Sequence, residues 1–275
     1  MISCKNIKRI YIAVVVLMII VFYYLFIIRV LPLLAYLLII DFSGWCVYSI
    51  YFFALRKRES SLMSLMNDCR IAEFIEKYSN EHAKDTRKGF YSGSAIILAT
   101  AYMYLGELET SIEMFTAIEL QNSQEVRKLF AVNVFIEHAL YHNNISCAYL
   151  RCHEIDQAKL HMEKARDYLK KLQDIENKKR KKIPDIDILN GALALRELEL
   201  ELELNIKQDY EEEIKMIKNM LDDAECILQK VYYNYTLYVL CRKNGDHDEA
   251  GKYGEYVKKN GGDTCYVKWV ENTVI

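Results

Sequence analysis

The stretch Leu98–Ile118, LATAYMYLGELETSIEMFTAI, decides the fold. It opens with an apolar residue beside the small Ala99, and Tyr102 follows about one helical turn later. After Gly106 a small residue again precedes an aromatic one, Phe115. Small residues let two helices approach closely, aromatic side chains fill the space beside them, and glycine permits a tight turn. The stretch therefore predicts a hairpin of two antiparallel helices.

The same pattern recurs further along the chain. His153 takes the place of the turn glycine 47 residues later, and the third copy has its turn at Gly245, another 92 residues on. Because 92 is twice 46, one further pair of helices is expected between them, near 186–206 and 209–229, with a turn around 206–208. Asn244-Gly245-Asp246 predicts a turn followed by a capped helix.

These copies resemble the tetratricopeptide repeat, a helical hairpin that stacks into solenoids. The resemblance implies an α-solenoid over residues 59–275, with a concave groove that binds a protein or peptide partner. Repeat packing is assigned to Tyr102, Gly106, Phe115, Tyr149, Ala158, Ala165, Gly245 and Ala250. Groove candidates are Tyr91, Ser94, Thr100, Tyr104, Asn133, Glu137, His138, Asn190, Arg196, Asn234 and Tyr238.

The remaining soluble part also favours helix. The chain has only 2 prolines and 10 glycines, so few residues interrupt long helices. Leucines alternate with glutamates over 198–204, a strand period, but both residue types are strong helix formers and we predict helix. An apolar face at Ile71, Phe74, Ile75 and Tyr78 predicts a helix after a turn at 66–68. A short helix at 265–269 is expected to cap the open end of the array.

The first 58 residues differ sharply from this. Residues 10–28 carry no charge and would span about 28 Å as a helix, and residues 33–55 form a second apolar run. We therefore predict a hairpin of two transmembrane helices over 1–58, turning at 29–32 rather than at 41–44. The second helix is expected to continue into the first repeat, so that the whole protein is all-α.

Basic residues flank both spans, at Lys5, Lys8 and Arg9 and again at 56–58. The positive-inside rule then predicts a multi-pass protein of the cell membrane with both termini in the cytoplasm. Asp41 would lie within the second span. It either hydrogen-bonds within the hairpin or contacts a transmembrane helix of a partner.

Residues 59–275 hold 29 basic and 37 acidic residues, a net charge of −8, which argues against nucleic-acid binding. One basic run interrupts this acidic part. Lys178, Lys179, Arg180, Lys181 and Lys182 form either a solvated linker or a contact with anionic lipid head groups, with nucleic acid as a lesser alternative.

No motif predicts catalysis or a cofactor. The eight cysteines lack paired spacing, His153 and His161 lie in no zinc-binding frame, and the acidic clusters 211–213 and 222–223 are expected to be solvated helix faces. The predicted function is a membrane-anchored scaffold or adaptor that binds a protein or peptide. Two alternatives remain: an accessory subunit of a membrane transport or secretion complex that docks through the hairpin, and a regulator that responds to peptides.

Overall fold

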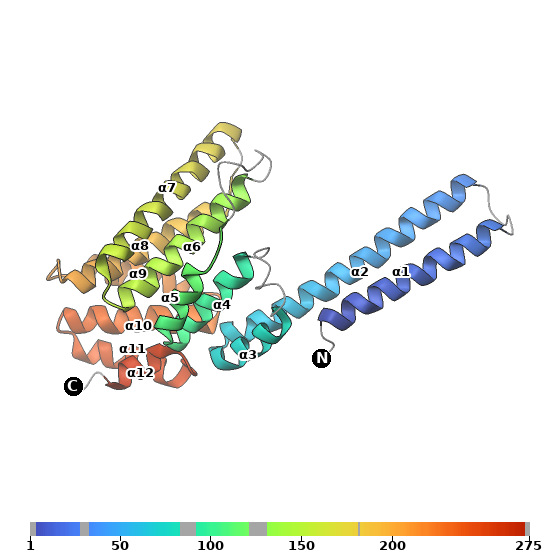
Figure 1. Ribbon diagram of the computed structural model, residues 1–275. Helices are drawn as coiled ribbons and strands as arrows, with labels where there is room; N and C mark the ends of the chain where they lie inside the picture. The colour runs from blue at the N-terminus through green and yellow to red at the C-terminus, as the bar shows by residue number, and fades with distance from the viewer. Residues whose placement is uncertain (1–3, 28–32, 83–91, 121–130, 181, 273–275) are drawn as a thin grey trace. The chain divides into compact units, whose positions relative to one another are not determined.

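The computed structural model describes residues 4–27, 33–82, 92–120, 131–180 and 182–272. These residues form twelve α-helices and no strand, so the all-α prediction is confirmed (Figure 1). The chain divides into two compact units, Met1–Ser64 and Leu65–Ile275.

The first unit contains α1 (Cys4–Ile27) and most of α2 (Leu33–Asn67). The rings of Tyr11 and Tyr51 lie 4.4 Å apart between the two helices. The predicted turn at 29–32 lies outside the described residues, but the rival turn at 41–44 is excluded because α2 runs unbroken through it. Large apolar side chains are exposed along both helices, Ile50 and Phe53 among them at 70% each.

The prediction of two transmembrane spans is wrong. In the described part of the chain, no helix is both long enough and apolar enough to cross a bilayer. Both basic clusters lie inside helices, because α1 begins before Lys5 and the 35-residue α2 continues past Arg58. The continuation of α2 beyond the apolar run agrees with the prediction, as does the position of Asp41 within it. The predicted multi-pass location in the cell membrane is therefore also wrong. The alternative function as an accessory subunit of a membrane complex loses its basis, because it depended on docking through a transmembrane hairpin.

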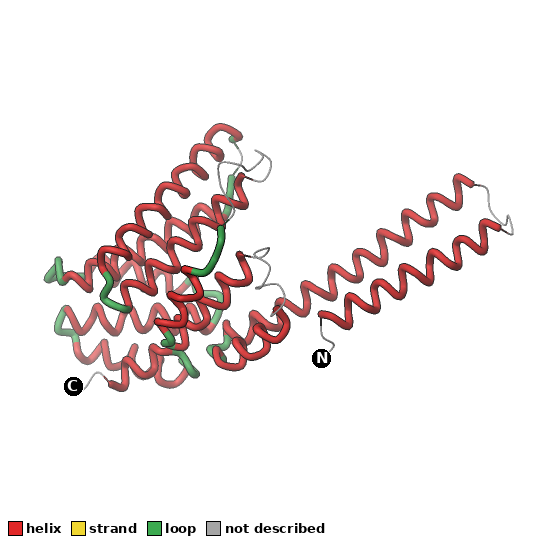
Figure 2. Tube along the Cα trace, viewed as in Figure 1, coloured by secondary structure: helices red, strands yellow, loops and turns green. Residues whose placement is uncertain are grey.

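The second unit contains the remaining helices, which follow one another in antiparallel pairs (Figure 2). They are α3 (Ile71–His82), α4 (Ser92–Leu105), α5 (Leu108–Thr116), α6 (Ala131–Arg151), α7 (Ile155–Lys179), α8 (Asp185–Leu204), α9 (Glu211–Asp222), α10 (Ile227–Lys243), α11 (His247–Asn260) and α12 (Cys265–Asn272).

The three predicted hairpins are present as α4–α5, α6–α7 and α10–α11. Their turns contain Gly106, His153 and Gly245, each with a positive φ (91°, 61° and 80°). His153 therefore adopts a left-handed conformation that glycine would adopt more easily. Asp246 caps α11 by accepting a hydrogen bond from the backbone N–H of Glu249 at 3.1 Å, as predicted.

Small residues do bring the paired helices together. The hydroxyl of Ser111 on α5 donates to the carbonyl of Ala99 on α4 at 2.8 Å, and both residues are fully buried. Phe115, Ala158 and Ala165 are also fully buried. The other packing candidates, Tyr149 and Ala250, are buried, whereas Tyr102 is half-buried.

The two predicted middle helices are present as α8 and α9, and the leucine–glutamate stretch is helical. They do not form the predicted pair, because α8 packs mainly against α6 and α7 and α9 mainly against α10. However, α9 ends at Asp222 rather than near 229. The cause is a capping box at the start of α10: the side-chain carbonyl of Gln229 accepts from the backbone N–H groups of Glu225 (2.8 Å) and Cys226 (3.3 Å). These bonds begin a new helix where the sequence predicted the old one to continue.

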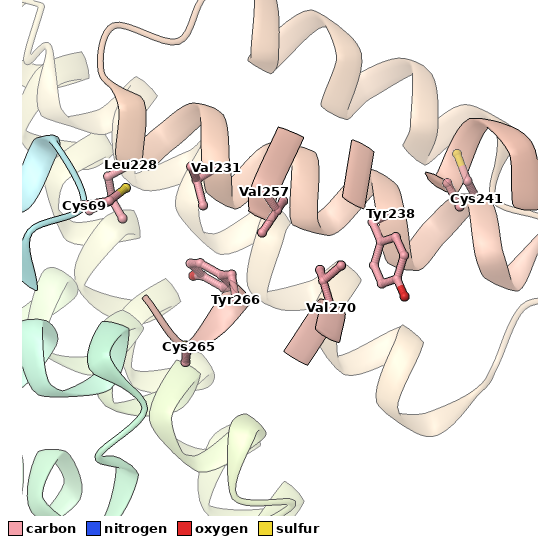
Figure 3. Close-up of a cluster of buried hydrophobic side chains, with 10 residues drawn as sticks. Cys69, Leu228, Val231, Tyr238, Cys241, Val257, Cys265, Tyr266 and Val270 are labelled. Atoms are coloured by element: carbon pink, nitrogen blue, oxygen red, sulfur yellow. The ribbon is translucent and has the colours of Figure 1, made fainter. Parts of the chain in front are cut away.

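The end of the second unit contacts its beginning through hydrogen bonds and apolar packing. The predicted helix α3 is present, with Ile71, Phe74, Ile75 and Tyr78 all buried. Its first two backbone N–H groups, at Ile71 and Ala72, donate to the carboxylate of Asp263 at 2.6 and 2.8 Å. In Figure 3, Cys69 joins the same apolar cluster as side chains from α10, α11 and α12.

This closure corrects the prediction for the last helix. We expected residues 265–269 to cap the open end of an array, but α12 packs against α4, α10 and α11 together. Its Tyr266 is fully buried. Because α12 bridges the first and last hairpins, its aromatic side chains become part of the interior of the unit.

Candidate functional site

A cavity of about 650 Å³ opens between the inner faces of α5, α6, α8, α10 and α12. Apolar side chains from four of these helices line it, including Leu108, Leu150, Leu202 and Val239. On α10, Thr236, Val239 and Lys243 share one face because successive members are three and four residues apart, and Tyr235 lies four residues before Val239. The cavity therefore depends on helical periodicity in several elements at once.

Arg151, in the last turn of α6, forms part of the wall and is surrounded by aromatic rings. The centre of its guanidinium group lies 5.8 Å from the ring of Tyr104, 5.2 Å from that of Tyr266 and 5.4 Å from that of Trp269. Such contacts contribute about 0.5–2 kcal/mol each, depending on how far they exclude water. The guanidinium also donates to the Tyr266 hydroxyl at 2.6 Å and, at 3.4 Å, to the carbonyl of Met103.

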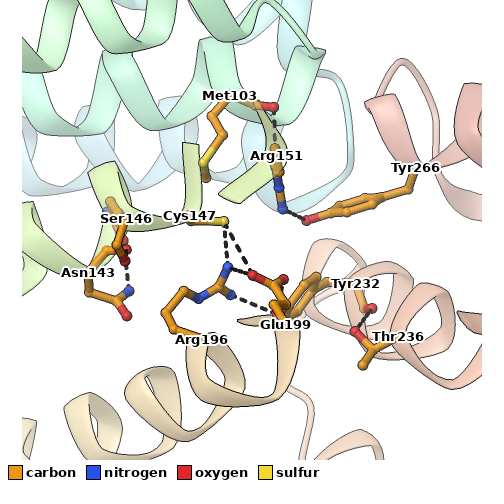
Figure 4. Close-up of polar contacts among 11 residues, drawn as sticks. Met103, Asn143, Ser146, Cys147, Arg151, Arg196, Glu199, Tyr232, Thr236 and Tyr266 are labelled. Atoms are coloured by element: carbon orange, nitrogen blue, oxygen red, sulfur yellow. Dashed lines mark hydrogen bonds and ion pairs between the residues drawn. The ribbon is translucent and has the colours of Figure 1, made fainter. Parts of the chain in front are cut away.

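A second guanidinium, that of Arg196, belongs to the polar cluster drawn with Arg151 in Figure 4, although Arg196 is not among the residues that line the cavity. Arg196 and Glu199 are three residues apart on α8 and form an ion pair, with 8% and 21% of their side chains exposed. Arg196 also donates to the hydroxyl of Tyr232 at 2.7 Å, and that hydroxyl donates to the other oxygen of Glu199 at 2.9 Å. Arg196 contacts the Cys147 sulfur as well. Both carboxylate oxygens of Glu199 are thus engaged within the protein.

The neighbouring titratable groups stay neutral. Burial raises the pKa of the Cys147 thiol, and it raises the pKa of the Tyr232 and Tyr266 phenols well above their usual value. Burial likewise raises the pKa of Tyr104 to about 12. The cluster around the cavity wall consequently contains two guanidinium cations and one carboxylate, without an anionic thiol or phenol.

Two polar contacts lie at the solvent-exposed edge of the cavity, which we call the rim. Lys243, which is exposed, donates to the side-chain carbonyl of Asn205 at 2.8 Å. The imidazole of His153 contacts the carboxylate of Glu203. Glu203 therefore has a partner at the rim, whereas Arg151 and Lys243 lie beyond ion-pair distance of any carboxylate in the described residues.

Few of the sequence-predicted groove residues belong to this site. Tyr104 and Arg196 do, whereas Thr100, His138, Asn234 and Tyr238 are buried elsewhere in the helix packing. Tyr91 lies outside the described residues. Asp41 is exposed on α2 in the other unit.

The basic run lies away from the cavity. Lys178 and Lys179 end α7, Arg180 follows with a left-handed φ of 48°, and Lys182 pairs with Asp187 at 2.9 Å. Lys181 lies outside the described residues. Contact of this run with lipid stays a prediction.

The histidines and cysteines considered as metal ligands do not cluster in the described part of the structure. No group of three or more such ligands occurs among the residues that the structure describes. Cys147 belongs to the arginine cluster, and His161 faces His142 with 2.9 Å between their Nδ1 atoms. Of the acidic clusters, 211–213 begins α9 and 222–223 ends it.

Sequence reasoning missed Arg151, Glu199, Tyr232, Tyr266 and Trp269. A signal existed for Arg151, since it follows Cys147 and Leu150 on the buried face of α6, where a cation needs a specific environment. Tyr266 and Trp269 are three residues apart, so they are expected to lie on the same face of a helix. This spacing does not predict what that face contacts. Neither protein-family models, curated proteins nor solved structures gave a match to this chain.

Proposed function

We propose that residues 65–275 form an array resembling tetratricopeptide repeats that binds a segment of a partner protein or peptide. The observation that carries this proposal is the cavity of about 650 Å³ on the inner faces of the helices. Its volume lies in the range of sites that enclose small ligands or a few side chains. Three hairpins with left-handed residues at their turns support the repeat resemblance.

The composition of the wall favours binding over chemistry. Glu199, the most enclosed carboxylate of the wall, is held by Arg196 and Tyr232, so both of its oxygens are engaged within the protein. Arg151 is fixed by aromatic rings on several sides. A wall whose polar groups are held in place this way presents a preorganised surface, which lowers the entropic cost of binding.

Selection from a random heptapeptide pool, displayed with free C-termini, tests the proposal with the full chain. We expect a set of related sequences to be enriched. Val239→Trp and Leu202→Trp, which place an indole in the cavity, should abolish their binding. Leu160→Trp is the matched control, because Leu160 is exposed on α7 outside the cavity, and it should bind as the wild type does.

Circular dichroism and thermal unfolding establish that each variant is folded. If no sequences are enriched, or if both cavity-filling variants bind the enriched peptides with unchanged affinity, the proposed function is wrong.

A further inference from the structure

The cavity wall and the buried cluster beside it together carry one excess positive charge. Arg151 and Lys243 line the cavity and Arg196 lies in the adjoining cluster, whereas the described lining holds two carboxylates: Glu199, which is bonded to Arg196, and Glu203, which is bonded to His153. The burial of Cys147, Tyr232 and Tyr266 keeps these groups protonated and neutral. One positive charge therefore remains without a counter-charge in a partly enclosed site, where a charge is costly unless it is paired.

This charge is assigned to Arg151, because Arg151 lines the cavity and has no ion-pair partner among the described carboxylates. A guanidinium has five N–H donors, and Arg151 uses its two terminal nitrogens toward Tyr266 and Met103, the latter at a long 3.4 Å. The aromatic rings around it accept no conventional hydrogen bond but hold the group in position. Three of the five N–H groups of Arg151 therefore have no hydrogen-bond partner among the described residues, and a planar set of such donors suits an oxyanion.

The surroundings favour a carboxylate. Four aliphatic side chains and Trp269 line the cavity, while Lys243 supplies a second cation at the rim. A single negative charge matches the single excess charge of the wall and its adjoining cluster, and apolar neighbours suit the aliphatic part of a peptide. A phosphate group would bring up to two negative charges beside Glu199 and Glu203.

We propose that the cavity binds a carboxylate of a peptide segment, with Arg151 as its hydrogen-bond donor and Lys243 as a rim contact. This inference rests on the proposed function and specifies the ligand group. The carboxylate belongs to an Asp or Glu side chain or to a free C-terminus, and these two sources share the same chemistry.

The experiment uses the full chain with Trp45→Phe, which leaves Trp269 as the only tryptophan and places a fluorescent reporter in the cavity wall. The probe is an enriched heptapeptide, synthesised as its free acid and as variants in which one carboxylate at a time becomes an amide. Amidation of the C-terminus and Asp→Asn or Glu→Gln replacements distinguish the two sources. We expect one of these replacements to weaken binding about tenfold or more.

Arg151→Gln should cause a similar loss with the free acid and little further loss with the critical amide. Lys243→Met, at an exposed site, should weaken binding of the free acid several-fold and reduce its dependence on salt. Arg166→Gln is the control, because Arg166 pairs with Glu197 on the surface away from the cavity, and it should leave affinity unchanged.

The inference is wrong if no carboxylate-to-amide replacement lowers affinity more than about twofold. It is also wrong if a folded Arg151→Gln variant binds the free acid normally, or if a phosphoserine peptide binds tenfold more tightly than its glutamate form. The peptide replacements leave the protein intact, so they decide the matter even if Arg151→Gln does not fold. Peptides that bind without needing a carboxylate would overturn this inference alone, whereas unchanged binding to both cavity-filling variants would overturn the proposed function too.

Discussion

The carboxylate of Asp263 accepts hydrogen bonds from the backbone N–H groups of Ile71 and Ala72, at 2.6 and 2.8 Å. Ile71 precedes Asp263 by 192 residues, yet the carboxylate acts on α3 as a helix cap normally does from the adjacent position. The backbone N–H of Asp263 also donates to the carbonyl of Cys69 at 3.2 Å. These bonds join the two ends of the second unit, and they make the stability of α3 depend on residues at the opposite end of the chain.

Replacement of Asp263 by Ala should therefore lower the free energy of unfolding by about 1–2 kcal/mol, the usual cost of losing a helix cap. Urea unfolding followed by circular dichroism measures this change. Asp167→Ala is the control, since Asp167 is exposed within α7 and should change stability by less than about 0.5 kcal/mol. Equal effects of the two substitutions would contradict the role of Asp263 as a distant cap.

Gly262 should tolerate a side chain less well than Gly245, although both have positive φ values of 57° and 80°. A Cβ atom at Gly262 would lie 2.2 Å from the carbonyl oxygen of Cys69, whereas at Gly245 it would meet no atom within 4 Å. We expect Gly245→Ala to cost about 1–2 kcal/mol from backbone strain alone. Gly262→Ala should lower the free energy of unfolding by clearly more in the same assay, because the added methyl group would push residue 262 away from Cys69. A smaller or equal decrease would show that the contact between these two segments is loose.

Removal of Glu199 should be strongly destabilising. Glu199→Ala leaves the buried Arg196 without its ion-pair partner, and loss of one member of a buried pair costs about 3–5 kcal/mol. Glu197→Ala breaks an exposed pair with Arg166 and should cost less than about 1 kcal/mol. Thermal and urea unfolding of both variants test the contrast. An Arg196→Met, Glu199→Leu double variant should recover part of the stability that Glu199→Ala loses.

Stability should fall as the solution becomes acidic, through two facing histidines. Burial, together with His161 and Lys164, lowers the pKa of His142 to about 3; burial and Lys164 lower the pKa of His161 to about 4. In the unfolded chain both rings titrate near 6.5. Between about pH 6.5 and 4 the unfolded state therefore binds more protons, and the free energy of unfolding decreases as pH falls.

Urea unfolding at pH 7.5 and at pH 5 measures this decrease. The double substitution His142→Asn, His161→Asn should reduce it, while His247→Asn, at an exposed position in α11, should leave it as in the wild type. An identical pH dependence in all three proteins would mean that these two facing rings do not contribute.

Local patterns predicted the hairpins well. Gly106, His153 and Gly245 occupy turns, and the apolar face from Ile71 to Tyr78 is buried, because these features depend on neighbours within a few residues. The same reasoning predicted two helices in the first part of the chain, with the second continuing past the basic cluster at 56–58, and α1 and α2 agree with this. It failed on the membrane, because no helix in the described part of the chain is both long enough and apolar enough to cross a bilayer.

The all-helical class and the positions of the tight turns follow from local patterns, since helix propensity and backbone conformation are local properties. The tertiary structure alone decided the site. Arg151, Glu199 and Trp269 lie on three helices separated by up to 118 residues, and nothing in the spacing of any one helix predicts their meeting. They come together because Asp263 and Gly262 fasten the end of the unit to its beginning, which brings α12 into contact with α4 and α10 and its aromatic rings against the guanidinium.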